Sequence, residues 1–448
     1  MTGVQTCALP ILGRYIAHRP VRRLVPGASG GRRVCFGLGD GHGSGVMDAM
    51  RHLNPLLFLT LFVFGASAVF AQTSNSTSSD SIRVCDDLNA EVETGGLRKD
   101  MLALLRDKKY HALQDMLDDR HARMLTGEFS DRALDRLTGF ADSADPALEP
   151  LLDEWVRSSQ SSFMALLVRG KYYASVGWKK RGTRFSDQTS QDQMDAMGDA
   201  FKKAWSDFVA SSKKQPQSVL PYPELMQIAS ATGNSSEVPG ILTRANALVP
   251  QNLIARLMAV RRLSPRWGGS FEATDKILAQ AKIEKLNPTD LRRLEFATLQ
   301  VKAAHFKDVE KRPIEALPYY TQAAKLCNSY AAWAEVSSIH YDREDWPQVE
   351  AATNQYMRLR PDTAWAYNRR GWALEKQGRL KDAISDFERA AEQGSDYAQN
   401  KIGYFYMTGN GFPKDLGKAR VLFEKANAQG NKSAKANLEF MARSVEAK

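Results

Sequence analysis

The sequence predicts an all-α protein built from stacked helical hairpins, an α-solenoid, with a helical domain before it. Three observations predict this class. Apolar residues recur at intervals of three and four from about Leu97 to the end of the chain. No stretch alternates apolar and polar residues as a half-buried strand does. Finally, FERAAEQG at 387–394 recurs as FEKANAQG at 423–430, and an offset of 36 residues is typical of helical repeats.

The first 46 residues do not have the pattern of a folded domain. Met1–Ile11 resemble a translated sequencing-adapter oligonucleotide, and residues 12–46 resemble read-through from upstream DNA, rich in Gly and Arg without an apolar period. The alternating glycines of this segment lack the preceding strand and the following helix that a phosphate-binding loop requires. We therefore interpret residues 1–46 as foreign to the natural protein.

A signal peptide is predicted over residues 47–71. A start at Met47 or Met50 is followed by a short basic region, the apolar run LLFLTLFVF and small residues. Cleavage after Ala71 or Ala68 would place the protein in the periplasm or outside the cell, without a stable membrane span. The apolar run is shorter than the roughly 20 residues of a membrane-spanning helix. An uncleaved N-terminal anchor is the alternative.

The net charge of the mature chain bears on the class of partner that the protein can bind. The whole chain has a formal net charge of +10, but residues 1–71 contain seven Arg and two Asp. Without them, 54 basic and 49 acidic residues remain, a net charge of about +5. Because nucleic-acid binding depends on clustered Lys and Arg, we expect no nucleic-acid partner. The two remaining cysteines, Cys85 and Cys327, could form a disulfide or stay as two thiols.

A helical domain is predicted over residues 95–290, after a flexible polar leader at 72–94. Its apolar residues fall on single faces of helices that are separated by Pro, Gly, Asn and Ser clusters. The expected core positions and helical segments are Leu97, Met101, Leu104 and Leu105; Leu113, Met116 and Leu117; Leu148, Leu151, Leu152 and Trp155 after Pro146; and the segments 162–178, 191–211, 222–232 and 236–247.

Residues 291–396 contain the repeated units. The segment 364–395 carries small residues where two helices of a hairpin must touch and an aromatic residue where a gap must be filled. These positions are Tyr367, Gly371, Leu374, Gly378, Ala383, Phe387 and Ala390, and together they resemble the tetratricopeptide repeat. The preceding segment 330–363 has the same frame with less similarity, and Ala316, Tyr320 and Ala323 suggest a further unit.

The last unit, residues 397–448, has a different character. Its Gly403, Tyr406, Gly409 and Gly411 resemble a Sel1-like repeat, a helical hairpin with a widened turn at GNGFPKD. The two turn glycines are expected to adopt positive φ. A closing helix is expected over Ser433–Ser444.

Two stretches of the central domain resemble a bacterial family known only as a domain of unknown function. They are Trp-Lys-Lys-Arg-Gly at 178–182 and Pro-Arg-Trp-Gly-Gly-Ser at 265–270. The resemblance covers roughly residues 95–285 and implies a helical fold without a known activity. Packing and turn geometry explain both stretches, with Ser270 as a helix N-cap. The alternative is a site of a cell-wall or polysaccharide-associated enzyme, or of its activator, formed by Trp178, Arg181, Arg266 and Trp267.

Catalytic and metal motifs are absent from the sequence. We find no H-E-x-x-H, G-x-S-x-G or phosphate-binding loop, and His111 and His121 are interpreted as surface or boundary residues. We therefore predict no metal, no cofactor and no enzyme activity. The sequence leaves the oligomeric state open.

A partner-binding surface follows from the tetratricopeptide resemblance, because the first helices of such repeats line a concave groove. Two Trp with Asn and Arg there suit a protein or peptide partner, since aromatic rings give contact area and Arg binds carboxylates. In an alternative interpretation of equal weight, the Trp side chains pack between repeats. The predicted binding residues are Tyr341, Trp365, Asn368, Arg369, Trp372 and Glu375.

Overall fold

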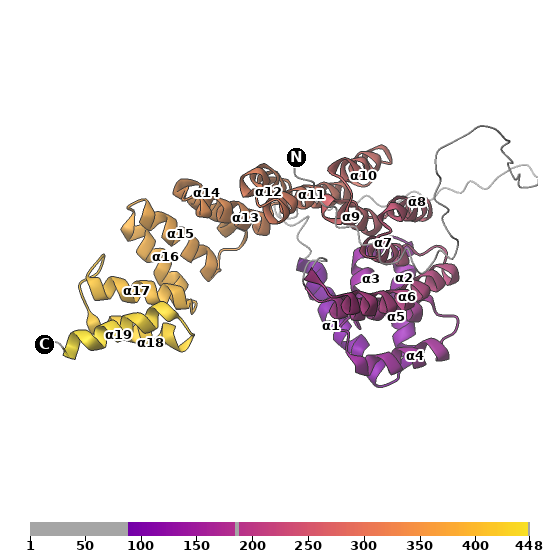
Figure 1. Cartoon of the computed structure of the whole chain (residues 1–448), viewed down its shortest axis with the longest axis horizontal. Coiled ribbons are helices and arrows are strands. Elements are labelled where there is room, and N and C mark those ends of the chain that lie inside the picture. Colours follow the sequence, from indigo (N-terminus) through magenta and orange to yellow (C-terminus); the bar gives the residue numbers. More distant parts are fainter. Residues whose placement is uncertain (1–87, 184–187, 447–448) are drawn as a thin grey trace, which may run out of the picture. The chain divides into compact units, whose positions relative to one another are not determined.

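The computed structural model describes residues 88–183 and 188–446, and within these ranges every regular element is a helix (Figure 1). The all-α class is therefore confirmed. The read-through segment, the signal peptide and Cys85 lie outside the described residues. The first described helix begins at Leu88, inside the segment expected to be a leader. None of the described helices is long and apolar enough to cross a membrane.

Eleven α-helices form the N-terminal part of the described chain. They are α1 (Leu88–Arg106), α2 (Tyr110–Leu125), α3 (Asp131–Thr138), α4 (Glu149–Ser158), α5 (Phe163–Arg181), α6 (Gln191–Lys214), α7 (Pro221–Ala231), α8 (Val238–Leu248), α9 (Ile254–Arg262), α10 (Phe271–Ile283) and α11 (Pro288–Ala304), with short turns η2 (Pro146–Leu148), η4 (Ser235–Glu237) and η5 (Pro265–Trp267). Side-chain N-caps begin several of them. The Ser162, Ser190 and Ser270 hydroxyls each accept a backbone N–H of the first turn.

One hydrophobic core extends through this part, from Met101 to Leu294. The apolar positions expected from helical spacing contribute to it: Leu105, Leu117 and Trp155 are fully buried. The short helix α3, which sequence analysis did not predict, also contributes buried leucines. The helical period of its apolar residues is hard to recognise in the sequence, because α3 spans only eight residues between two loops.

Eight helices of the C-terminal part follow in hairpins. They are α12 (Pro313–Cys327), α13 (Tyr330–Asp342), α14 (Trp346–Leu359), α15 (Ala364–Lys376), α16 (Leu380–Glu392), α17 (Asp396–Thr408), α18 (Leu416–Ala428) and α19 (Lys432–Glu446), and a π-helical turn, η6 (His305–Val309), precedes them. From α12 onward each helix packs against the next one in the chain (Figure 1). This nearest-neighbour packing defines a helical solenoid. Cys327, buried in α12, is engaged in a disulfide.

Glycine–phenylalanine contacts close the hairpins. A Cβ atom on Gly371 would lie 3.0 Å from the ring of Phe387, and one on Gly403 would lie 2.8 Å from the ring of Phe423. Both rings are fully buried. The small residue therefore lets the two helices of each hairpin approach closely enough for the ring to fill the space between them, as the sequence predicted for Gly371 and Phe387.

The same contact closes the α5–α6 hairpin of the N-terminal part. A Cβ atom on Gly170 would lie 2.6 Å from the ring of Phe208. In the α5–α6 and α15–α16 hairpins an Arg precedes the glycine and an Asp precedes the phenylalanine. The two side chains form a bidentate ion pair, Arg169 with Asp207 and Arg370 with Asp386. The N-terminal part thus contains a hairpin closed like those of the repeats.

The turn between α17 and α18 is widened, as predicted for the last unit. Gly409 ends α17 with φ +79° and Gly411 has φ +81°, conformations that residues with a Cβ adopt rarely. The rings of Tyr406 and Phe412 stack across the turn with centroids 4.4 Å apart. The Asp415 side chain then caps α18. The closing helix α19 begins at Lys432, one residue before the predicted start.

Candidate partner-binding site

The predicted binding residues lie on α13 and α15. Within α15, Trp365, Arg369 and Trp372 follow one another at intervals of four and three, so they share one face of the helix. The opposite face carries Tyr367, Gly371 and Leu374, which are buried against neighbouring helices. The division of the helix into a buried face and a half-exposed aromatic face is therefore set by the local sequence.

Arg369 sits between two aromatic rings. Its guanidinium carbon is 4.1 Å from the ring centroid of Tyr341 on α13 and 5.4 Å from that of Trp365. Trp365 also packs against Tyr356 of α14, with centroids 4.8 Å apart. Burial lowers the pKa of Arg369, and no carboxylate of the described residues forms an ion pair with it. A half-buried cation held by aromatic faces can still donate hydrogen bonds to an incoming carboxylate.

A groove of about 620 Å³ opens beside Trp372, between α15 and α17. The ring centroids of Trp372 and Tyr397 lie 6.1 Å apart, with an angle of 64° between the ring planes. The Lys401 ammonium is 4.7 Å and the Lys376 ammonium 5.4 Å from the Trp372 centroid. The residues that line the groove are Trp372, Glu375, Lys376, Tyr397, Asn400, Lys401 and Tyr404.

The α17 residues of this groove repeat those of α15. The segment 365–372 reads WAYNRRGW, and the segment 397–404 reads YAQNKIGY. Each consists of an aromatic residue, then Asn and a basic residue, then Gly and a second aromatic residue. Sequence analysis selected the first set alone. The second set could have been found by aligning the next repeat with the first and selecting the residues at the equivalent positions.

Glu375 and Asn368 have partners within the repeats. One carboxylate oxygen of Glu375 pairs with Lys401 at 2.9 Å, and the other is buried without a hydrogen-bond partner in the described chain. The Asn368 amide nitrogen donates to the Ser395 hydroxyl at 2.7 Å. Asn368 therefore joins α15 to the N-terminus of α17, and the structure gives it a linking contact rather than a place in the groove lining.

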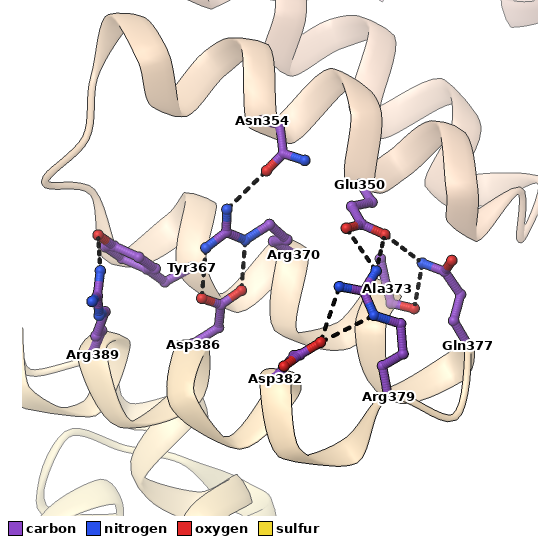
Figure 2. A network of polar contacts seen from close by, with 10 residues as sticks. All are labelled: Glu350, Asn354, Tyr367, Arg370, Ala373, Gln377, Arg379, Asp382, Asp386 and Arg389. Carbon is purple, nitrogen blue, oxygen red and sulfur yellow. Dashed lines mark hydrogen bonds and ion pairs between the residues drawn. The ribbon is translucent and has the colours of Figure 1, made fainter.

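A polar network behind α15 fixes the groove (Figure 2). Arg370 lies between two neighbours: its guanidinium donates to both carboxylate oxygens of Asp386 on α16, at 2.7 and 2.8 Å, and to the Asn354 side chain on α14 at 2.8 Å. Beside it, Arg379 pairs with Glu350 at 2.9 Å. These contacts tie three successive helices together, so the aromatic face of α15 has a defined orientation.

The second predicted set, Trp178, Arg181, Arg266 and Trp267, comes together only in part. The two Trp rings pack edge to face with centroids 6.2 Å apart, and the Arg181 guanidinium carbon is 5.9 Å from the Trp178 centroid. Arg266 is exposed. The enzyme alternative requires all four side chains around one ligand, and of these four the contacts of this junction join only Trp178, Arg181 and Trp267.

Arg262, which sequence analysis did not select, occupies the space between the two Trp rings. Its guanidinium carbon lies 4.4 Å from the Trp267 centroid and 5.8 Å from that of Trp178. Burial lowers the pKa of Arg262 to about 10. The side chain also donates to Gln227 at 2.7 Å. A cation packed in this way binds α9, α5 and η5 together as a helix junction.

The described part of the chain contains no candidate metal site, because no three His, Cys, Asp or Glu side chains lie close enough there to hold a metal ion. The two histidines interpreted as surface or boundary residues differ from each other in burial. His111 is exposed, whereas His121 is 4% exposed and packs against Phe163 with ring centroids 4.7 Å apart.

A family model of the tetratricopeptide repeat matches residues 364–397. No curated protein matches the sequence. Among solved structures, a protective antigen of uropathogenic Escherichia coli with an SLR fold is 14% identical, with 75% of this chain and 73% of that one covered and a TM-score of 0.32. A Sel1 repeat protein from Oxalobacter formigenes is 16% identical, with 68% and 94% covered and a TM-score of 0.26. Human IFIT1, solved as a dimer with m7Gppp-AAAA, is 14% identical, with 78% and 92% covered and a TM-score of 0.30.

The packing of α12–α19 and the family match agree on the architecture of the C-terminal part. Residues 364–397 therefore match a tetratricopeptide repeat, and they lie within the helical solenoid formed by α12–α19.

Proposed function

We propose that this chain is an exported scaffold that binds a protein or peptide partner along the first helices of its C-terminal repeats. The observation that carries the proposal is the repeated set of aromatic and basic residues on α15 and α17. Trp372 and Tyr404 line one groove together with Tyr397 and Lys401. The first helices of two successive repeats, with the same kinds of side chains, suit an extended ligand, which can meet equivalent contacts one repeat apart.

The charge of this surface favours an acidic ligand. Arg369, Lys376 and Lys401 are its cations, and Glu375 is the acidic residue among the groove-lining side chains. Since Lys401 already neutralises Glu375, and neither Arg369 nor Lys376 forms an ion pair within the described residues, two cations are available to carboxylates of a partner. Aromatic rings beside them would add contact area at a small loss of side-chain freedom.

Export is supported by two features. The signal-peptide pattern of residues 47–71 directs the chain out of the cytoplasm. The disulfide at Cys327 suits an oxidising compartment, because thiols in the cytosol are kept reduced. Together they support a periplasmic or secreted location.

Capture of a partner by the immobilised protein tests the groove. We expect the double variant Trp372→Ala with Lys376→Gln to lose the partner that the unmodified protein retains, with far-ultraviolet circular dichroism unchanged. Lys381→Gln, a change of an exposed lysine on α16, is the matched control and should retain it.

The double variant Trp365→Ala with Arg369→Ala tests whether the binding surface extends to α13. If the partner is captured equally by the unmodified protein and by both double variants, the groove is not the binding surface. Equal capture by the second double variant alone would confine the surface to the groove between α15 and α17.

A further inference from the structure

A polar cavity of about 890 Å³ lies in the N-terminal part, and none of its lining residues belongs to the repeat groove. One face of α2, the loop between α4 and α5, and the end of α6 form its walls. Hydroxyl and amide groups are frequent in its lining, since every residue from Ser158 to Ser162 contributes, together with Gln114 and Gln215. A cavity of this size can hold a small molecule.

His121 and Ser162 are buried polar residues in the lining of this cavity, and His121 is the larger of the two. It is 4% exposed, and its Nε2 atom has no hydrogen-bond partner among the described residues. Burial lowers the pKa of His121, so the ring is neutral in the unliganded protein at neutral pH. A buried ring nitrogen without a partner costs free energy unless a ligand or water completes its hydrogen bonding.

The N-terminus of α5 points its first amide groups toward the same loop. Ser162 caps this helix: its hydroxyl accepts the Ala165 N–H at 3.0 Å and donates to the Gln114 side chain at 2.5 Å. Gln114 in turn donates to Asp118 at 2.7 Å. This chain of hydrogen bonds fixes the serine loop, and the partial positive charge of the helix end favours an anion beside it.

Two cations flank the opening. Arg157, at the end of α4, is exposed, and its Nε donates to the Asp153 carbonyl. Lys214, at the end of α6, is exposed and reaches the Gln160 carbonyl of the serine loop. Asp118 is the carboxylate that faces them, and its bond to Gln114 holds it on α2. The charged groups around the cavity therefore leave an excess of positive charge, to which His121 adds when it is protonated.

We propose that this cavity binds a small hydroxylated molecule that carries an oxyanion, a sugar phosphate or a sugar carboxylate. Arg157, Lys214 and the α5 N-terminus meet the anionic group. The serine and glutamine side chains meet the hydroxyl groups, and His121 completes the contact from the buried wall. The site is independent of the partner-binding groove, which lies on other helices.

Isothermal titration of the purified protein with glucose 6-phosphate, glucuronate and neutral glucose tests the site. Saturable binding of one charged sugar, at least tenfold tighter than that of glucose, is expected, and the preferred sugar distinguishes phosphate from carboxylate. Arg157→Gln with Lys214→Gln should weaken this binding by about three- to tenfold per removed charge. Lys213→Gln with Arg106→Gln, two exposed cations outside the cavity, should leave the affinity unchanged.

The pH dependence of the affinity identifies the buried histidine. Because an oxyanion stabilises the protonated ring, the affinity should rise as the pH falls from about 7.5 to 6. His121→Gln should abolish this rise, whereas His340→Gln, a change on α13 outside the cavity, should keep it. The proposal is overturned if neither charged sugar binds at millimolar concentration, if glucose binds equally well, or if both cation pairs have the same effect. A Trp372→Ala variant that binds the sugar normally while losing its protein partner would separate the two sites.

Discussion

Alanine in place of glycine should have opposite effects at two sites of the α5–α6 hairpin. Gly198 lies inside α6, and a Cβ atom added there would meet no atom within 4 Å. Gly198→Ala should therefore stabilise the protein by up to about 1 kcal/mol, the difference in helix propensity between the two residues. Gly170 lies inside α5, where the same propensity gain is available but the space is not.

The geometry at Gly170 sets the size of the opposing effect. An added Cβ would lie 2.6 and 2.9 Å from two ring atoms of Phe208, whose side chain is fully buried and cannot swing away. Overpacking of this kind costs roughly 1–3 kcal/mol. After subtraction of the propensity gain, Gly170→Ala should lose about 1 kcal/mol. At Gly371 the nearest ring atom is 3.0 Å away, so a small shift suffices and Gly371→Ala should be nearly neutral.

Urea denaturation followed by far-ultraviolet circular dichroism measures the three variants. We expect Gly198→Ala and Gly170→Ala to differ by about 2 kcal/mol in the free energy of unfolding, with Gly371→Ala between them. The double variant Gly170→Ala with Phe208→Leu should recover part of the loss, because the smaller side chain leaves room for the methyl group. If Gly170→Ala is as stable as Gly198→Ala, the glycine does not serve the close helix approach that we infer.

Three further predictions concern an ion pair, a buried histidine and the N-terminus. Arg370→Met should leave the carboxylate of Asp386 buried without its partner and cost about 2–4 kcal/mol, and the double variant with Asp386→Leu should restore most of it in the same urea assay. Because burial lowers the pKa of folded His121 below the ordinary 6.5, the unfolded chain takes up the proton first; stability is complete above about pH 6.5 and declines below it. His121→Gln should flatten this decline in thermal melts recorded from pH 7.5 to 5. N-terminal sequencing of the protein from a periplasmic fraction should begin at Gln72 or Val69, whereas a chain that keeps residues 47–71 in the membrane fraction would contradict cleavage.

The sequence by itself determined the helical class and the repeat frame of the C-terminal part. These features are local: the spacing of apolar residues defines a buried face, and a pair such as Gly371 and Phe387 specifies how two adjacent helices approach. The caps at Ser270 and the turn glycines Gly409 and Gly411 could be predicted for the same reason, since each depends on the conformation of a few neighbouring residues.

The sequence did not reveal that the α5–α6 hairpin is closed by the same glycine–phenylalanine contact and Arg–Asp ion pair as the α15–α16 hairpin. The Arg–Asp ion pair spans 38 residues in α5–α6 but only 16 in α15–α16, because the loop and the helices differ in length. A fixed sequence period therefore misses it, although the spatial contact is the same.

The tertiary structure alone decided which polar side chains meet. It placed Arg262 between the two Trp rings in place of Arg266, and it gave Asn368 a partner on the next hairpin. It also buried His121 in a cavity whose walls come from three separate segments. Helical spacing tells which face a residue occupies, but the neighbour opposite that face depends on how distant helices pack, and packing of this kind leaves no local pattern in the sequence.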